Sequence, residues 1–292
     1  MIPGFLLLMA ATAHSPVALR EQFERISAGA QGRAGAAAVL LETGESAAFH
    51  PDERFPMQSV YKMPIGMAVL RDVDRGRLAL EQKVIVASGD LVPVALHSPI
   101  RDKYPRGGVE LSVRELLRYM VADSDGTACD ALLRLAGGPE RVTAYLRGLG
   151  VNGIVVATSE KEMAASDDVQ YRNWATPKAM VELLAAFQKG RGLSPASRAL
   201  LMQFMTETGT GPRRLKGLLP AGTVVAHKTG TSGTAKGLTR ATNDAGLITL
   251  PDGRHLAVAV FVADSKANTD ARERVIAEIA RAAWDYWTNP GR

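Results

Sequence analysis

The sequence predicts an α+β fold in which both ends of the chain build one antiparallel sheet, flanked by terminal helices, with a helical domain inserted between them. Alternating, β-branched segments bounded by turn residues cluster near the two ends of the chain. The middle of the chain instead carries helical patterns and loops with few strand signals. We therefore expect a sheet domain at residues 14–55 and 206–292 and an all-helical domain at residues 56–205.

Two hairpins and one further strand are expected in the sheet domain. The first hairpin pairs residues 36–42 with 46–50 across Thr43-Gly44-Glu45, and the second pairs 244–250 with 255–264 across Pro251-Asp252-Gly253. Gly, Asp and Pro are the residues that such turns favour. A strand at residues 223–228 precedes the second hairpin, and helices at residues 17–27 and 271–286 begin and close the domain.

Residues 1–13 have the pattern of an export signal, with an apolar run at residues 5–10 and a small-residue cleavage site at Ala11-Thr12-Ala13. The mature chain would then begin near His14, and a periplasmic or secreted protein is expected. No later stretch approaches the roughly 20 apolar residues that a membrane-spanning helix needs, so no membrane span is expected.

Composition is that of an ordinary globular protein, with 46% hydrophobic and 22% charged residues. The formal charge of +5 suits an anionic small molecule, but the basic residues are scattered among 30 acids, which argues against nucleic-acid binding. Cys129 is the only cysteine, so no internal disulfide is expected, and the histidines show no metal-ligand spacing. We expect no metal, no cofactor and a monomer.

Ser59-Val60-Tyr61-Lys62 is the first motif that indicates catalysis. An apolar stretch follows it, which predicts a buried helix whose first turn holds Ser59 and places Lys62 on the same helical face. A serine hydroxyl is a poor nucleophile, but a lysine amine kept neutral by burial or by cationic neighbours can take its proton. Taken alone, the pattern is more typical of a serine N-cap beside a surface lysine.

Ser124-Asp125-Gly126 is the second motif, and it lies between two amphipathic segments at residues 111–121 and 128–135. It predicts a short polar loop between helices that presents a hydroxyl to a cleft. An ordinary turn has the same composition.

Lys228-Thr229-Gly230 and the following Thr231 form the third motif, at the end of a predicted strand. Strand alternation would point Lys228 and Gly230 to one face and the two threonines to the other. The alternative is an edge strand protected by a lysine. In their fixed order, the three motifs indicate a serine acyl-transfer site at the junction of the two domains.

This ordered set resembles the signature of class A β-lactamases and penicillin-binding proteins. The resemblance covers nearly the whole mature chain. Longer strings, 57–62, 170–174 and 210–223, are similar to the PER-type, extended-spectrum branch of the class A enzymes. The resemblance implies a fold with the active site between the sheet and the helical domain.

The resemblance also implies catalytic roles. Ser59 would attack the β-lactam carbonyl, and Lys62 would shuttle its proton. The backbone N–H groups of Ser59 and Thr231 would form the oxyanion hole. Ser124 would pass a proton to the departing ring nitrogen, with Lys228 keeping the local potential positive.

Substrate-binding roles follow in the same way. Thr229, Thr231 and Arg214 would bind the substrate carboxylate, for which a guanidinium fork is well matched. Gly126 stands where the family usually has an asparagine, so an amide that contacts lysine and substrate is missing. His97 falls where relatives place an aromatic residue at the cleft rim, and a plain loop histidine is the alternative.

Glu160 is the expected base that activates the water for hydrolysis of the acyl-enzyme. It stands with Met163 in the family pattern, although Ala164 replaces the usual asparagine, and Glu162 is the second choice. Whether such a glutamate also serves as the acylation base is disputed in the family.

We interpret the chain as a serine β-lactamase that hydrolyses penicillins and cephalosporins. The alternatives are a penicillin-binding D,D-peptidase and a sensor that is acylated without turnover. Glu160 argues against the peptidase, which lacks a dedicated deacylating glutamate, and the sensor would need a coupled signalling segment. An inactive homologue is expected to lose Ser59, Lys62 or Glu160, and all three are present.

Overall fold

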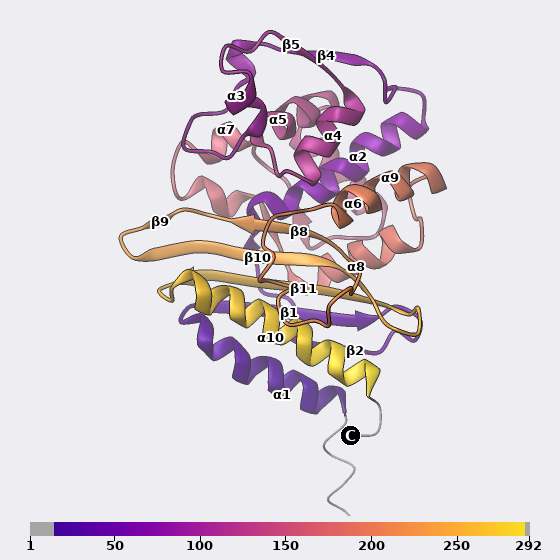
Figure 1. Ribbon diagram of the computed structural model, residues 1–292, viewed down its shortest axis with the longest axis vertical. Coiled ribbons are helices and arrows are strands. Elements are labelled where there is room, and N and C mark those ends of the chain that lie inside the picture. Colours follow the sequence, from indigo (N-terminus) through magenta and orange to yellow (C-terminus); the bar gives the residue numbers. More distant parts are fainter. Residues whose placement is uncertain (1–14, 290–292) are drawn as a thin grey trace, which may run out of the picture.

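The computed structural model describes residues 15–289, so the expected export signal at 1–13 lies outside the described residues. A central antiparallel sheet has the terminal helices α1 (Pro16–Ser27) and α10 (Thr269–Thr288) on one face, and most of the other helices lie beyond its other face (Figure 1). This arrangement confirms the predicted fold class. Within residues 15–289, none of the helices combines the length and apolarity needed to cross a bilayer.

The main sheet has the strand order β2-β1-β11-β10-β8, and β9 also pairs with β10. Its strands are β1 (Arg33–Leu40), β2 (Ser46–Phe49), β8 (Val225–Thr231), β9 (Thr234–Ala235), β10 (Leu238–Thr249) and β11 (His255–Ser265). Antiparallel pairing of β1 with β11 joins the two ends of the chain, as predicted. The largest difference is β10, which begins six residues before the expected 244 because it continues beyond β8 to pair with β9.

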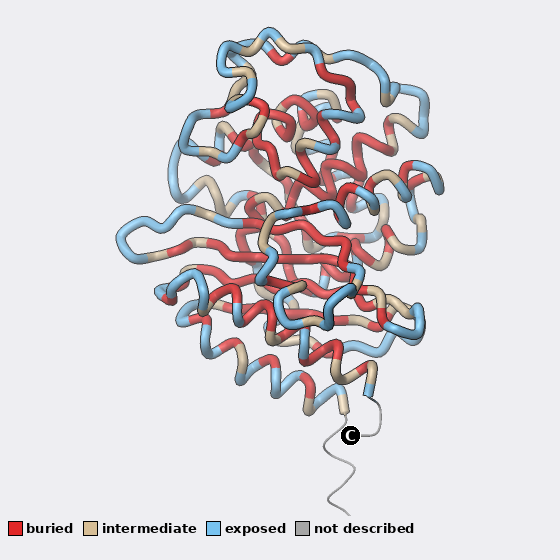
Figure 2. The backbone as a smooth tube through the Cα atoms, in the orientation of Figure 1, coloured by how far each residue is buried: buried red, intermediate tan, exposed pale blue. Residues whose placement is uncertain are grey.

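Both faces of the sheet are buried, and β11 shows how its sequence serves both. Leu256, Val258, Val260 and Val262 join the core under α1 and α10, whereas the alternate residues Ala257, Ala259, Phe261 and Ala263 join the opposite core. Figure 2 shows the resulting band of buried backbone through the centre of the molecule. Small side chains on the second face allow α8 (Pro177–Gln188) to pack directly on β1, β10 and β11. Although α8 falls in the segment expected to form the helical domain, it covers the sheet, and the domain boundaries stay a prediction.

The remaining elements form the helical part of the molecule and its connections. The α-helices are α2 (Lys62–Asp74), α3 (Pro99–Lys103), α4 (Val113–Val121), α5 (Gly126–Leu135), α6 (Pro139–Gly148), α7 (Glu160–Met163) and α9 (Pro195–Thr206). Short 3₁₀ turns are η1 (Ala28–Ala30), η2 (Gln58–Tyr61), η3 (Ser88–Asp90) and η4 (Val169–Arg172). Helix α2 is buried continuously through its first nine residues, 62–70, as the apolar stretch predicted.

Two small sheets were not predicted. One pairs β4 (Lys83–Val86) with β5 (Val109–Ser112), and the other has the order β3-β7-β6, with β3 (Phe55–Pro56), β6 (Ile154–Val155) and β7 (Trp174–Ala175). Strands of two to four residues are too short to display a period in the sequence.

A substitution at Gly246 tests how closely β10 packs against β8. It lies opposite His227, and a Cβ atom at this position would lie 2.5 Å from the carbonyl oxygen of Ala226 and 2.6 Å from the Cβ of His227. We expect Gly246→Ala to lower the free energy of unfolding by about 2 kcal/mol, measured by urea denaturation, because backbone must move to admit the methyl group. Gly89→Ala is the control, since nothing lies within 4 Å of its Cβ position. Equal stability of the two variants would contradict the tight β8–β10 contact.

Candidate active site

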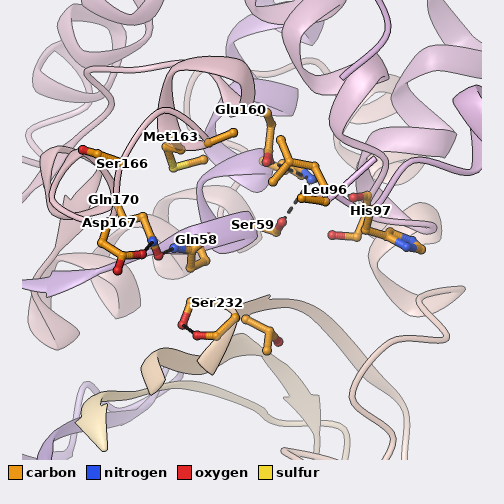
Figure 3. A pocket seen from close by; sticks show the side chains of 16 residues that line it. Gln58, Ser59, Leu96, His97, Glu160, Met163, Ser166, Asp167, Gln170 and Ser232 are labelled. Atoms are coloured by element: carbon orange, nitrogen blue, oxygen red, sulfur yellow. Dashed lines mark hydrogen bonds and ion pairs between the residues drawn. The ribbon is translucent and has the colours of Figure 1, made fainter. Parts of the chain in front are cut away.

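A cavity of about 440 Å³ lies where the sheet meets the helical part of the molecule. Six residues with predicted roles line it: Ser59, Lys62, His97, Ser124, Glu160 and Thr231. Glu160 and Met163 approach from one side and Ser232 from the other, with Ser59 between them (Figure 3). The three motifs, of which the first and third are separated by more than 160 positions in the chain, therefore meet at one cavity, as expected.

The turn that carries Ser59 is held between the sheet and α2. Ser59 lies in the 3₁₀ turn η2, which runs directly into α2 at Lys62. Gly230 of β8 packs so closely that a Cβ atom there would lie 2.3 Å from the carbonyl oxygen of Met57. Asn243 of β10 donates from Nδ2 to the carbonyl oxygens of Pro56 (2.8 Å) and Met57 (3.1 Å). The backbone just before the nucleophile is thus fixed by two adjacent strands.

Lys62 is buried and has three oxygen partners. Its Nζ donates to Ser59 Oγ (3.0 Å) and to the carbonyl oxygen of Ser124 (2.7 Å), and it forms an ion pair with Glu160 Oε1 (2.9 Å). Burial is the largest single effect on Lys62 and lowers its pKa, but the charges and hydrogen bonds of its neighbours, Glu160 first among them, raise it, so the net pKa lies above the ordinary value. The direction of this pKa shift favours a charged Lys62 in the free protein, and its role as the carrier of the Ser59 proton stays a prediction.

Ser124 reaches both lysines from a strained turn. Its φ angle of 58° lies in the left-handed region, and the next residue, Asp125, is the N-cap of α5. The buried Asp125 carboxylate accepts from the backbone N–H groups of Ala128 (2.8 Å) and Ile100 (2.7 Å). With the turn held in this way, the Ser124 carbonyl faces Lys62 and its hydroxyl faces Lys228.

Lys228 is fully buried and donates from Nζ to Ser124 Oγ (2.9 Å) and to the carbonyl oxygen of Thr229 (3.1 Å). Burial, together with the positive charge of Lys62, lowers the pKa of Lys228 to about 7. That Lys228 keeps the local potential positive during the reaction stays a prediction. Near neutral pH the ammonium and the neutral amine are both populated.

Arg214 and the Lys-Thr-Gly strand are connected beneath the cavity. The guanidinium donates to Thr231 Oγ1 (2.7 Å) and to the carbonyl oxygens of Gly230 (3.2 Å) and Asn243 (2.9 Å). Its Nε pairs with the buried Glu273 of α10 at 3.1 Å. Arg214 is itself buried and does not appear among the residues that line the cavity, whereas Thr231 does.

Two further residues predicted to bind substrate also lie behind the cavity wall. Thr229 is buried, and its hydroxyl is hydrogen-bonded to that of Thr210 at 2.6 Å. Gly126 is the first residue of α5 and donates its N–H to the carbonyl oxygen of His97 (3.0 Å). Neither lines the cavity. His97 is exposed at the rim, where its Nε2 is 2.9 Å from the carbonyl oxygen of Asp123.

Glu160 begins the short helix α7, whose N-terminus is held by an acid that sequence reasoning missed. Asp130 of α5 accepts from the backbone N–H of Glu160 (2.7 Å) and of Lys161 (3.1 Å). Burial, followed by the charge of Glu160, raises the pKa of Asp130 to about 6, against the opposing effect of those two N–H groups. An aspartate inside a predicted helix carries no sign of this long-range contact.

The ends of the segment that carries Glu160 are joined by Asn173. Its Oδ1 accepts from the N–H groups of Ala157 (2.7 Å) and Thr158 (3.0 Å), and its Nδ2 donates to the Thr158 carbonyl oxygen (2.9 Å). Glu162, the second choice for the base, is exposed and accepts from the N–H of Ser159 at 2.8 Å in a capping box. The structure thus points Glu160 rather than Glu162 toward Lys62.

Two contacts tie this segment to the opposite wall of the cavity. Gln58, next to Ser59, donates from Nε2 to Gln170 Oε1 at 2.5 Å (Figure 3). Arg240 of β10 pairs with Asp167. Sequence reasoning missed both pairs. Within residues 15–289, no group of three or more His, Cys, Asp or Glu side chains is arranged to hold a metal ion.

Comparisons with known proteins agree with this geometry. The sequence profile of the β-lactamase enzyme family matches residues 18–287. The chain is 46% identical to the extended-spectrum β-lactamase PER-1 of Pseudomonas aeruginosa, over 94% of this chain and 89% of that protein. The fold is similar to that of a β-lactamase from Chitinophaga pinensis, with a TM-score of 0.89 at 48% identity over 91% of this chain and 98% of that one.

A class A β-lactamase from Bacteroides cellulosilyticus gives a TM-score of 0.86 at 34% identity, over 92% of this chain and 98% of that one. The family profile covers nearly the whole described chain, and these relatives share its fold over nearly their full length. The chain therefore belongs to the β-lactamase enzyme family, and within that family to the class A serine β-lactamases.

Proposed function

We propose that the protein hydrolyses the β-lactam amide of penicillins and cephalosporins through an acyl-enzyme on Ser59, with Glu160 activating the hydrolytic water. One observation carries this proposal: the Nζ of Lys62 lies 3.0 Å from Ser59 Oγ and 2.9 Å from Glu160 Oε1. Lys62 thus contacts both the proposed nucleophile, Ser59, and the proposed carboxylate base, Glu160, and can carry a proton between them.

Acylation begins with a proton transfer that the charge state of Lys62 dictates. Because Lys62 is an ammonium in the free protein, it accepts the Ser59 proton only after it gives one of its own to Glu160. Ser59 Oγ then bonds to the β-lactam carbonyl carbon, and the carbonyl oxygen becomes an oxyanion. The geometry favours Glu160 as the ultimate base for acylation, with Lys62 as the carrier.

The backbone N–H groups of Ser59 and Thr231 are proposed to hold that oxyanion. The close packing of Gly230 against Met57 supports this role, because it keeps β8 against the turn that carries Ser59. As the ring C–N bond breaks, Ser124 donates its hydroxyl proton to the nitrogen. Lys228, 2.9 Å from Ser124 Oγ, is placed to replace that proton.

The substrate carboxylate is proposed to meet Thr231, which lines the cavity. Arg214 lies directly behind Thr231 and provides a fixed positive charge, and Thr229 supports the same strand from its buried position. Four of the five N–H groups of Arg214 already have protein partners, so direct contact with substrate would use the remaining Nη2–H or replace one of these partners. His97 is proposed to border the substrate at the rim of the cavity. Gly126 has no side chain, so we propose that this side of the cavity offers the substrate no side-chain amide.

Deacylation distinguishes this proposal from the alternatives. Glu160 is 94% buried yet lines the cavity beside Ser59, which is the position a base needs to activate water in a low-dielectric site. A D,D-peptidase or a non-hydrolysing sensor has no need of such a group, and the relatives reported above are β-lactamases. PER-1 is named an extended-spectrum enzyme. From this similarity we propose cephalosporin hydrolysis for this chain and no wider range of substrates.

We also propose a periplasmic or secreted monomer. The apolar run and small-residue cleavage site at residues 1–13 support export. Fractionation of cells that express the full chain, followed by analytical ultracentrifugation of the mature protein, tests location and oligomeric state separately.

Glu160→Gln tests the assignment of the deacylating base. We expect a stable adduct on Ser59 after incubation with a chromogenic cephalosporin, and a turnover rate at least about a hundredfold lower, because general-base catalysis typically contributes factors of this size. A time course combined with intact mass spectrometry gives both quantities. Ser59→Ala is the control and should form no adduct, while multiple turnovers by Glu160→Gln would refute the role of Glu160.

Asp130→Asn tests the acid that holds α7. Because folding raises the pKa of Asp130 to about 6, this group makes the wild type lose stability as pH rises from about 4 to about 6, and the loss persists above that range. The variant lacks this titration. We expect its free energy of unfolding, relative to wild type, to increase by about 2 kcal/mol between pH 4 and pH 7 in urea denaturation. Asp52→Asn, at an exposed position, should show a constant difference from wild type; a constant difference for Asp130→Asn too would overturn the assignment.

Lys228→Arg tests the charge at the Lys-Thr-Gly strand. With a pKa of about 7, Lys228 loses its ammonium as pH rises through neutrality, so kcat/KM for a penicillin should fall there, approaching about tenfold per pH unit. An arginine stays charged, so the variant should show a flatter profile between pH 7 and about 8.5. Thermal unfolding checks that the larger side chain is accommodated. A wild-type kcat/KM that stays constant over this range would contradict the prediction.

A further inference from the structure

A second cavity, of about 420 Å³, lies behind the segment that carries Glu160. Its lining includes Arg54, Pro56, Ala157, Tyr171, Arg172 and Trp174. These residues come from β3, β7 and the two ends of the Glu160 segment. None of the predicted catalytic or substrate-binding residues lines it.

The charge of this cavity is positive and uncompensated. Arg54 and Arg172 are both exposed, and within residues 15–289 neither guanidinium forms an ion pair with a carboxylate. No acidic residue lines the cavity. Two acids near this part of the chain are engaged elsewhere: Glu53 pairs with Arg33 at 2.6 Å, and Asp264 pairs with Arg33 at 3.0 Å and accepts from the hydroxyl of Tyr171, a lining residue.

Arg54 is held in an orientation suited to an anion. Its guanidinium carbon lies 4.1 Å from the centroid of the Trp174 ring. A guanidinium stacked on an aromatic face keeps its N–H groups available along the edge, where a carboxylate binds in a bidentate manner. The apolar atoms of Pro56 and Ala157 complete a wall that an organic body can contact.

The position of the cavity connects it to the active site. Ala157 and Arg172 flank the clamp that Asn173 forms with the N–H groups of Ala157 and Thr158. Gln170, two residues before Arg172, lines the active-site cavity. The same segment thus forms a wall of both cavities, and Glu160 lies within it.

We propose that this second cavity binds a small organic carboxylate, held by Arg54 and Arg172, and that the bound carboxylate alters the segment that carries Glu160. The binding is independent of the enzyme's reaction. The effect on turnover rests on the proposed function, because it acts through Glu160.

Titration of the isotopically labelled mature protein with sodium benzoate, followed by NMR, tests the binding. We expect shifts of the Trp174 indole N–H and of the amides of Ala157 and Arg172, and none with benzamide, which has the same ring and no charge. The double variant Arg54→Gln/Arg172→Gln should bind benzoate about tenfold or more weakly. Arg147→Gln, an exposed arginine of α6, is the matched control and should bind as wild type does.

Steady-state kinetics with a chromogenic cephalosporin tests the coupling. Saturating benzoate should change kcat at least twofold in the wild type and leave kcat of the double variant unchanged. Shifts confined to residues of the active-site cavity, or equal affinity of the double variant, would overturn the site. Binding at Trp174 with no change in wild-type kcat would overturn the coupling alone. Absence of cephalosporin turnover by the wild type without benzoate would contradict the proposed function and leave the binding site unaffected.

Discussion

The buried ammonium of Lys62 is the constraint on which the rest of the site depends. A charge with 1% exposure is tolerable only where oxygen atoms surround it, and Lys62 takes one each from the turn before α2, the turn before α5 and the start of α7. These three segments are far apart in the chain. Satisfying one cation therefore brings together Ser59, Ser124 and Glu160, which we propose as the nucleophile, the proton donor to the leaving nitrogen and the deacylating base.

The same cation determines the state of the second lysine. The adjacent Glu160 raises the pKa of Lys62, whereas Lys228 forms no ion pair with a carboxylate within residues 15–289, and burial and then Lys62 itself lower its pKa. An anionic substrate near Lys228 would favour the charged amine by linkage. Binding of the substrate anion and protonation of Lys228 would thus be coupled, and in the proposed mechanism the proton gained is the one that Ser124 needs when the ring nitrogen departs.

Local patterns predicted much of this, and long-range contacts account for what they missed. The paired β1–β11 strands, the buried α2 and the meeting of the three motifs follow from periodicity, turn residues and resemblance. The sequence of α8 reads as one more helix of the inserted domain, because nothing local says that alanines on β11 leave room for it on the sheet. The local sequence likewise does not predict the contacts of Asp130 and Asn173, because each side chain bonds to backbone that is 15 to 31 residues away in the chain.

The contacts of Asp130 and Asn173 also explain how the departures from the family pattern are accommodated. Ala164 lacks the amide that usually helps to hold the water, and Gly126 lacks the amide that usually contacts the lysine. Here the Ser124 carbonyl supplies a partner for Lys62 at 2.7 Å, and Asp130 fixes the backbone of Glu160 directly. Positioning of the base thus rests on main-chain anchors at its own position and on the clamp at the ends of its segment. Because those anchors hold the backbone rather than the water, we expect substitutions within the segment that keep the backbone path to alter deacylation less than substitutions that disturb it.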